Sequence, residues 1–158
     1  MSETTAVSGL KWVKGELIDS LRRVRGQLEA IISSEGPADC SDAITALYEV
    51  RGVLAALQLP APARLAEEMQ RLMERLAAGS LPNRDMAAEA LMLALIQLPN
   101  HLDRLGAGYQ DPPVILLPSI NDLRVSRGAR PLKAAELAAP SPALTDIATP
   151  TPEVLKAL

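Results

Sequence analysis

The residues with the clearest chemical potential lie in one short stretch, Tyr48-Glu-Val-Arg51-Gly52. The phenol of Tyr48 could accept a transferred group, and Arg51 supplies a cation about one helical turn later. Gly52 carries no side chain and leaves the helix surface open to a partner. A phenol with a pKa near ~10 is almost wholly neutral at pH 7, so it cannot replace an imidazole in rapid reversible transfer. The stretch therefore combines a cation and an open surface with a weak acceptor.

Other candidates for chemistry are few. His101, the only histidine, is either an alternative acceptor or a polar residue near a helix end, and the second interpretation is favoured because nothing places another catalytic group beside it. Cys40 lies in a predicted loop without a histidine nearby in sequence, which argues against a reactive thiol. Glu67 and Glu68 have the spacing of surface carboxylates. One histidine and one cysteine cannot build a nitrogen and sulfur metal site, so we expect no metal, cofactor or catalytic residue.

The composition indicates an all-α fold with an aliphatic core. The 158 residues include no Phe, and the aromatic residues are Trp12, Tyr48 and Tyr109. Ala, Leu, Glu and Arg favour helices, and apolar residues never alternate with period two. A net charge of −3 with mixed signs argues against a nucleic-acid partner. The polar start, the single cysteine and the lack of an apolar run of ~20 residues predict a cytoplasmic protein without signal peptide or membrane span.

Apolar residues at helical spacing predict four main helices and a shorter fifth. They run from about Gly9 to Ser34, from Asp39 or Ser41 to Leu57–Leu59, from Pro60–Pro62 to Gly79, from Arg84 (with Asn83 as N-cap) to Leu105, and from Ser119 to Arg127. The short loops predict an antiparallel four-helix bundle with an additional C-terminal helix. Residues 1–8 are predicted as a flexible arm, residues 9–139 as the helical domain and residues 140–158, rich in Pro, Ala and Thr, as a linker or tail.

Two features of these helices bear on packing. Gly15 and Gly26 interrupt the first helix, and close approach of a neighbouring helix is the preferred explanation. The fourth helix adds Met86, Ala90, Leu93 and Ile96 to its main apolar stripe, so we expect it to contact neighbours on two sides. Pro99 within it predicts a kink.

The Tyr48 stretch resembles the His-x-x-Lys-Gly motif of histidine-phosphotransfer (Hpt) domains, with tyrosine at the histidine position. Longer runs are similar to the amino-terminal region of ChpA/PilL-type chemosensory hybrid histidine kinases of the type IV pilus (Pil–Chp) system, a module shared with FimL. The runs are Leu10-Lys-Trp-Val-Lys-Gly-Glu-Leu17, Leu65-Ala-Glu-Glu-Met69, Leu95-Ile-Gln-Leu-Pro99 with Leu102-Asp-Arg104, and Leu117-Pro-Ser-Ile-Asn-Asp-Leu-Arg124 with Arg127-Gly128. This resemblance covers roughly residues 9–130, and Trp12-Val-Lys-Gly favours the kinase over FimL.

The resemblance implies an Hpt-type four-helix fold in a protein that governs twitching motility. Because Tyr48 replaces the histidine, we expect a degenerate domain at the start of a chemosensory kinase, acting as a protein-interaction module without catalysis of its own. Tyr48, Arg51 and Gly52 would form its binding face. The residues alone fit a second interpretation of Tyr48 equally well, a half-buried position with the ring packed and the hydroxyl in water. The alternatives are a competent phosphorelay domain with an atypical acceptor (Tyr48 or His101), a FimL-type non-catalytic pilus regulator, and a helical spacer or dimerisation bundle.

The resemblance also implies the partners. They are pilus-system proteins such as a FimV-type polar scaffold, or other domains of the parent kinase, with no nucleic acid and no membrane insertion. Recruitment to the cell pole follows from such a scaffold. The segment Arg130-Pro131-Leu-Lys133 departs from the acidic, Leu-rich pattern of the family, so no contacts of that segment are expected to carry over.

Overall fold

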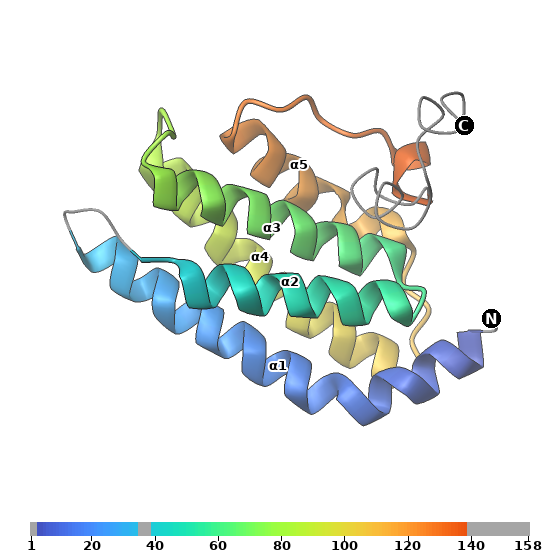
Figure 1. Cartoon of the computed structure of the whole chain (residues 1–158). Helices are drawn as coiled ribbons and strands as arrows, with labels where there is room; N and C mark the ends of the chain where they lie inside the picture. The colour runs from blue at the N-terminus through green and yellow to red at the C-terminus, as the bar shows by residue number, and fades with distance from the viewer. Residues whose placement is uncertain (1–2, 35–38, 139–158) are drawn as a thin grey trace, which may run out of the picture.

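The chain folds into five α-helices, seen in the computed structural model of Figure 1, which describes residues 3–34 and 39–138. The helices are α1 (Glu3–Ser33), α2 (Ser41–Ala56), α3 (Pro60–Ala78), α4 (Arg84–Gly106) and α5 (Leu117–Ser126), with short 3-10 helices η1 (Pro113–Leu116) and η2 (Ala134–Ala138). No strand occurs within the two described ranges, and the prediction of an all-α fold is confirmed. The predicted linker, residues 140–158, lies outside the described residues.

Several helix boundaries follow from local chemistry, as predicted. The Asn83 side chain accepts a hydrogen bond from the Met86 N–H at 3.0 Å and so caps α4. Pro60 and Pro62 stand in the first turn of α3, where a missing N–H costs nothing. Gly79 ends α3 with φ of +67°, a left-handed conformation that glycine adopts without strain.

Two helix starts were predicted wrongly. α1 begins at Glu3, not near Gly9, because residues 3–8 contain no Gly or Pro to stop a helix and the apolar stripe shows only where a helix is packed. α5 begins at Leu117 with Leu116 as its N-cap. Ser119 therefore lies inside α5, and its hydroxyl donates to the Gln97 side chain of α4 instead of capping the helix.

The first four helices contact one another in sequence order, and α4 returns to α1. α5 packs against α3 and α4 at the top of Figure 1. Lys14, in the first half of α1, pairs with Asp103 near the end of α4 at 3.1 Å. Arg84, at the start of α4, donates to the Ile31 carbonyl near the end of α1 at 2.6 Å. These two contacts make α1 and α4 antiparallel.

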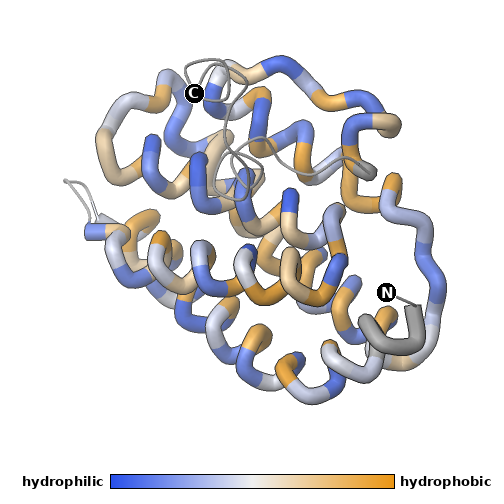
Figure 2. The backbone as a smooth tube through the Cα atoms, turned by 45° about the vertical axis from the view of Figure 1, so that its right-hand side comes forward, coloured by the Kyte–Doolittle hydropathy of each residue, from blue (hydrophilic) through white to orange (hydrophobic). Residues whose placement is uncertain are grey.

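The core is aliphatic, as the composition predicts. Hydrophobic and hydrophilic segments alternate along the helices in Figure 2. Every main helix contributes fully buried side chains, among them Leu28, Leu47, Leu65, Leu91 and Leu123, each 0% exposed. Ile120 and Leu123 of α5 point inward as predicted. The additional helix is therefore part of the core.

One packing expectation was wrong, and another is confirmed. A Cβ added to Gly15 or Gly26 would meet nothing within 4 Å, so neither glycine permits a close helix approach. As expected, α4 contacts neighbours on two sides, with α1 on one and α3 and α5 on another. Met86, Leu93 and Ile96 nevertheless remain 40%, 51% and 50% exposed. The neighbours cover the main apolar stripe of α4 but not its opposite side. Pro99 lies inside α4, and the kink there stays a prediction.

Candidate functional site

The surface predicted to carry function is the exposed side of α2. Tyr48 is 53% exposed and lies at the middle of this helix. Gly52, one turn later, is also exposed, and a Cβ built there would meet nothing within 4 Å. We call Tyr48 and Gly52 the Tyr48 face. An aromatic ring beside an open stretch of helix offers apolar area and close backbone access to a partner.

Arg51 does not belong to this face, which differs from the predicted three-residue surface. It is only 7% exposed, because its position borders the buried residues Val50 and Leu54. Its guanidinium lies 3.8 Å from the Glu67 carboxylate of α3 and 4.9 Å from the centre of the Tyr48 ring. Arg51 thus makes a cation–π contact with the Tyr48 ring. It also links α2 to α3 through its ion pair with Glu67.

The prediction that Glu67 and Glu68 are surface carboxylates is wrong. They are 1% and 0% exposed. α3 contacts α2 on one side and α5 on another, so its polar side faces a second helix. The spacing of residues within α3 could not predict the burial of these two glutamates, because their burial depends on where α5 packs.

Five arginines surround the two glutamates, and together we call these seven residues the α3 ion-pair cluster. Glu67 lies 3.0 Å from Arg71, 3.6 Å from Arg64 and 3.8 Å from Arg51, while Glu68 lies 2.7 Å from both Arg124 and Arg127 and 3.1 Å from Arg64. Glu67 and Glu68 are separated by about 100° around the helix. Glu67 therefore pairs with Arg51 of α2, and Glu68 pairs with Arg124 and Arg127 at the α5 side. The cluster joins three helices through charge-assisted contacts.

The electrostatics of Glu68 fit a structural role. Burial by itself would raise the pKa of this carboxyl, but hydrogen bonds and charges from Arg127 and Arg124 outweigh it, and the pKa lies below its ordinary value. Glu68 is therefore ionised at neutral pH and is not poised to donate or accept a proton. The sequence contained one signal for this: Arg124 and Arg127 recur at one-turn spacing, on the same side of α5.

The two remaining reactive side chains are buried. His101 is 6% exposed, and burial lowers the pKa of its imidazole, opposed by the charge of Asp111. A neutral, covered imidazole is not presented to another protein as a phosphoacceptor would be. Cys40 is 1% exposed. Burial, assisted by the charge of Asp39, raises the pKa of its thiol, which leaves little thiolate.

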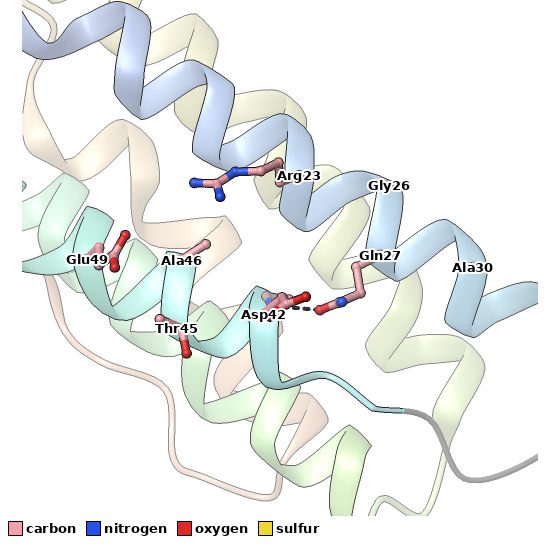
Figure 3. Close-up of a pocket in the computed structure, with 9 residues that line it drawn as sticks. Arg23, Gly26, Gln27, Ala30, Asp42, Thr45, Ala46 and Glu49 are labelled. Atoms are coloured by element: carbon pink, nitrogen blue, oxygen red, sulfur yellow. Dashed lines mark hydrogen bonds between the residues drawn. The ribbon is translucent and has the colours of Figure 1, made fainter.

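A groove between α1 and α2 was not anticipated from the sequence. It measures about 620 Å³. Figure 3 shows its residues on the two helices, and the lining is Arg23, Gly26, Gln27, Ala30, Asp42, Ala43, Thr45, Ala46 and Glu49. Gly26 and the alanines keep it open, and the Gln27 carbonyl accepts from the Ala43 N–H at 2.6 Å. Its lining contains no histidine, cysteine or tyrosine, so the groove offers no strong nucleophile.

Two further properties are limited to the part of the chain that the structure describes. No group of three His, Cys, Asp or Glu side chains there is arranged to hold a metal ion. None of the described helices combines the length and the apolar character needed to cross a bilayer.

Fold and site together define an all-helical domain with an exposed tyrosine on α2 and a buried cluster of ion pairs. No family model matches the chain, and no solved structure matches it. The chain is similar to the scaffold protein FimL of Pseudomonas aeruginosa, with 30% identity over 125 residues, which is 78% of this chain. It spans only 22% of the length of FimL. The predicted relation to the FimL module thus has support, whereas the ChpA/PilL relation stays a prediction.

Proposed function

We propose that this chain is a non-catalytic protein-interaction domain of the FimL type that acts in type IV pilus regulation. The similarity to a protein named as a scaffold supports this function better than it supports the start of a chemosensory kinase. The domain would be a degenerate Hpt-type four-helix bundle, with α5 added, working in the cytoplasm. A FimV-type scaffold at the cell pole is the partner we propose.

The observation that carries the proposal is the different placement of Tyr48 and Arg51. Tyr48 is 53% exposed, as a docking residue must be, while Arg51 is 7% exposed and engaged with Glu67. A phosphoryl group on the tyrosine would find this cation already committed to a carboxylate. The ring itself is held by the guanidinium at 4.9 Å, which limits the entropy lost when a partner binds it.

A second candidate is the amino-terminal module of a ChpA/PilL-type kinase. The Trp12-Val-Lys-Gly run supports it, and Trp12 is 88% exposed on α1. In that case other domains of the parent kinase would be further partners of the Tyr48 face.

The test is binding of the purified chain to the cytoplasmic domain of a FimV-type scaffold, measured by calorimetry. Tyr48→Ala should weaken binding by about tenfold or more, as truncation of an aromatic anchor does. Gly52→Gln should weaken it similarly, because the new side chain rises from open space beside Tyr48. Helical circular dichroism should be retained in both variants.

Tyr109→Ala is the matched control. Tyr109 is 57% exposed and is stacked on Arg104 at 4.4 Å, but it lies after α4 instead of on α2. This variant should bind as tightly as the wild type. Unchanged binding in both Tyr48→Ala and Gly52→Gln would place the docking surface elsewhere.

A further inference from the structure

One side of α4 is exposed to solvent along almost the whole helix. Eight residues share it, within a sector of about 100° around the helix axis. They are Asp85, Met86, Glu89, Leu93, Ile96, Asn100, Asp103 and Arg104, all of them exposed. We call them the α4 outer face. Leu93 and Ile96, 51% and 50% exposed, make its centre apolar.

The α4 outer face has a two-fold pattern. Its positions are symmetric about the peptide between Ala94 and Leu95, so an antiparallel second α4 would meet them in pairs. Leu93 would lie opposite Ile96, and Glu89 opposite the amide of Asn100. Asp85, in the first turn, would lie opposite Arg104, in the last turn. Apolar residues therefore meet at the centre and opposite charges at both ends.

We propose that the α4 outer face is a homodimer interface, in which a second copy of this chain packs its own α4 antiparallel across a two-fold axis. An isologous interface requires one patch that complements itself, and the α4 outer face does so in both hydrophobicity and charge. A partner of different sequence would need only a complementary patch of its own, and the placement of Asp85 against Arg104 would then have no role.

The local charges of α4 fit this arrangement. Asp103 is already paired with Lys14 at 3.1 Å, so Met86 of the second copy would approach a compensated carboxylate. Arg104 binds Asp111 at 2.9 Å, yet its side chain remains 51% exposed. A guanidinium has five N–H donors, which leaves some for an incoming Asp85. Antiparallel packing also sets the two helix dipoles in the favourable direction.

Neighbouring elements would widen the contact. A stable interface buries about 800 Å² per partner, more than one helix face supplies. Ile32 of α1 is 48% exposed and follows Ile31, whose carbonyl binds Arg84 at the start of α4. Ile115 of η1 is 46% exposed, and its carbonyl accepts from Gln97 of α4 at 3.2 Å. Ile32 thus lies near the start of α4 and Ile115 beside its middle, and both are exposed to a second copy.

The dimer would have a consequence for binding. α4 contacts α1, α3 and α5, so its outer face lies across the helices from α2. Two Tyr48 faces would then point away from the two-fold axis, and one dimer could engage two sites on a partner with increased avidity.

The first experiment measures the dimerisation constant of the full chain by sedimentation equilibrium. We expect a concentration-dependent dimer that Ile96→Glu weakens by at least about tenfold, because two like charges would meet near the axis. Leu93→Glu should weaken the dimer in the same way. It replaces Ile96→Glu in the test if that variant folds poorly. Val125→Glu is the matched control, since Val125 is also 50% exposed but lies on α5. It should dimerise like the wild type.

The second experiment tests the register by cross-linking with a short bis-maleimide. Glu89→Cys and Asn100→Cys lie opposite each other in the proposed dimer, so their mixture should cross-link faster than either variant alone. Two copies of position 89 would be about 16 Å apart along the axis. The proposal is overturned if the chain stays monomeric at all concentrations. It is also overturned if the Ile96→Glu variant dimerises as tightly as the wild type. Faster cross-linking of Glu89→Cys with itself would overturn the antiparallel arrangement.

Discussion

Tyr48 and Arg51 are three positions apart on α2, yet one side chain reaches solvent and the other lies under it. The difference comes from what each meets: Tyr48 faces open space, and Arg51 faces the buried carboxylate of Glu67 on α3. Arg51, whose cation would suit a phosphoryl group, therefore contributes to helix packing instead. At this scale, two predictions follow from where the charges lie.

The first concerns phosphoryl transfer. We expect that the wild type takes no label from acetyl phosphate or a phosphorylated receiver domain, because a tyrosine hydroxyl does not replace the imidazole of a phosphotransfer site and His101 is buried. Tyr48→His should accept little, since Arg51 is engaged with Glu67 at 3.8 Å. Phosphate-affinity gels measure the labelled fraction. Label on the wild type that disappears in Tyr48→Phe or His101→Ala would contradict the degenerate-domain interpretation.

The second concerns Glu68 and acid. Its pKa in the folded chain lies below its ordinary value of 4.5, so the unfolded chain binds the proton more readily. The stabilisation is complete above that ordinary value and is lost as the pH falls through the folded pKa. We expect thermal stability to drop in acid, with a shallower drop in Glu68→Gln. At neutral pH this variant should be about 3–5 kcal/mol less stable, the usual cost of breaking a buried ion pair.

Glu74→Gln provides the control for this prediction. Glu74 lies on the same helix but is exposed, so the variant should keep the wild-type pH profile. If Glu68→Gln and the wild type lose stability in parallel as the pH falls, other carboxylates determine the acid response.

At the scale of helices, α1 shows that a glycine need not mark a close contact. Gly26 lines the groove between α1 and α2 and meets nothing within 4 Å. Its missing side chain leaves the groove open, at a cost in helix stability. Gly79, in contrast, ends α3 with a φ of +67°, a left-handed conformation that costs a residue with a side chain more than it costs glycine.

These two glycines should respond to alanine in opposite ways. Gly26→Ala should stabilise the chain by about 0.4–1 kcal/mol, because alanine restricts the unfolded chain and fits the helix. Gly79→Ala should destabilise it by about 1 kcal/mol, because alanine is strained in the left-handed region. Urea denaturation measures both. A loss of stability in Gly26→Ala would mean that the groove does not tolerate even a methyl group.

At the scale of the whole molecule, α5 is joined to the other helices by both apolar and ionic contacts. Leu116, Ile120 and Leu123 are each 0% exposed. Arg124 and Arg127 reach Glu68 of α3, and the Asn121 side chain binds both backbone groups of Leu132. A four-helix bundle without α5 would leave Glu68 without its two closest cations.

A chain truncated after Gly108 should therefore lose most of its stability. Each buried Leu or Ile is worth about 1.5–3 kcal/mol, and a domain has only about 5–15 kcal/mol in total. We expect a broad, non-cooperative urea transition, compared with a single sharp one for the full chain. A truncated chain that unfolds as cooperatively as the full one would show that α5 is an accessory helix.

The sequence by itself determined the features that depend on neighbours in the chain. Local hydrogen bonds and backbone angles explain three of them: Asn83 caps α4, Pro60 and Pro62 stand at the start of α3, and Gly79 ends α3. The inward direction of Ile120 and Leu123 follows from their spacing within one helix. The sequence left Tyr48 open between an interaction surface and plain packing at a half-buried position, and the structure shows that it is 53% exposed.

Only the tertiary structure decided which helix faces are covered. Periodicity shows that Glu67, Glu68 and Arg71 share the polar side of α3, but not that α2 and α5 enclose it. The same periodicity places Leu93 and Ile96 on one side of α4. It does not show that this side stays uncovered by the other helices that the structure describes. The reason is physical: spacing sets the direction of a side chain relative to its own helix, whereas burial depends on which other helices pack against that direction.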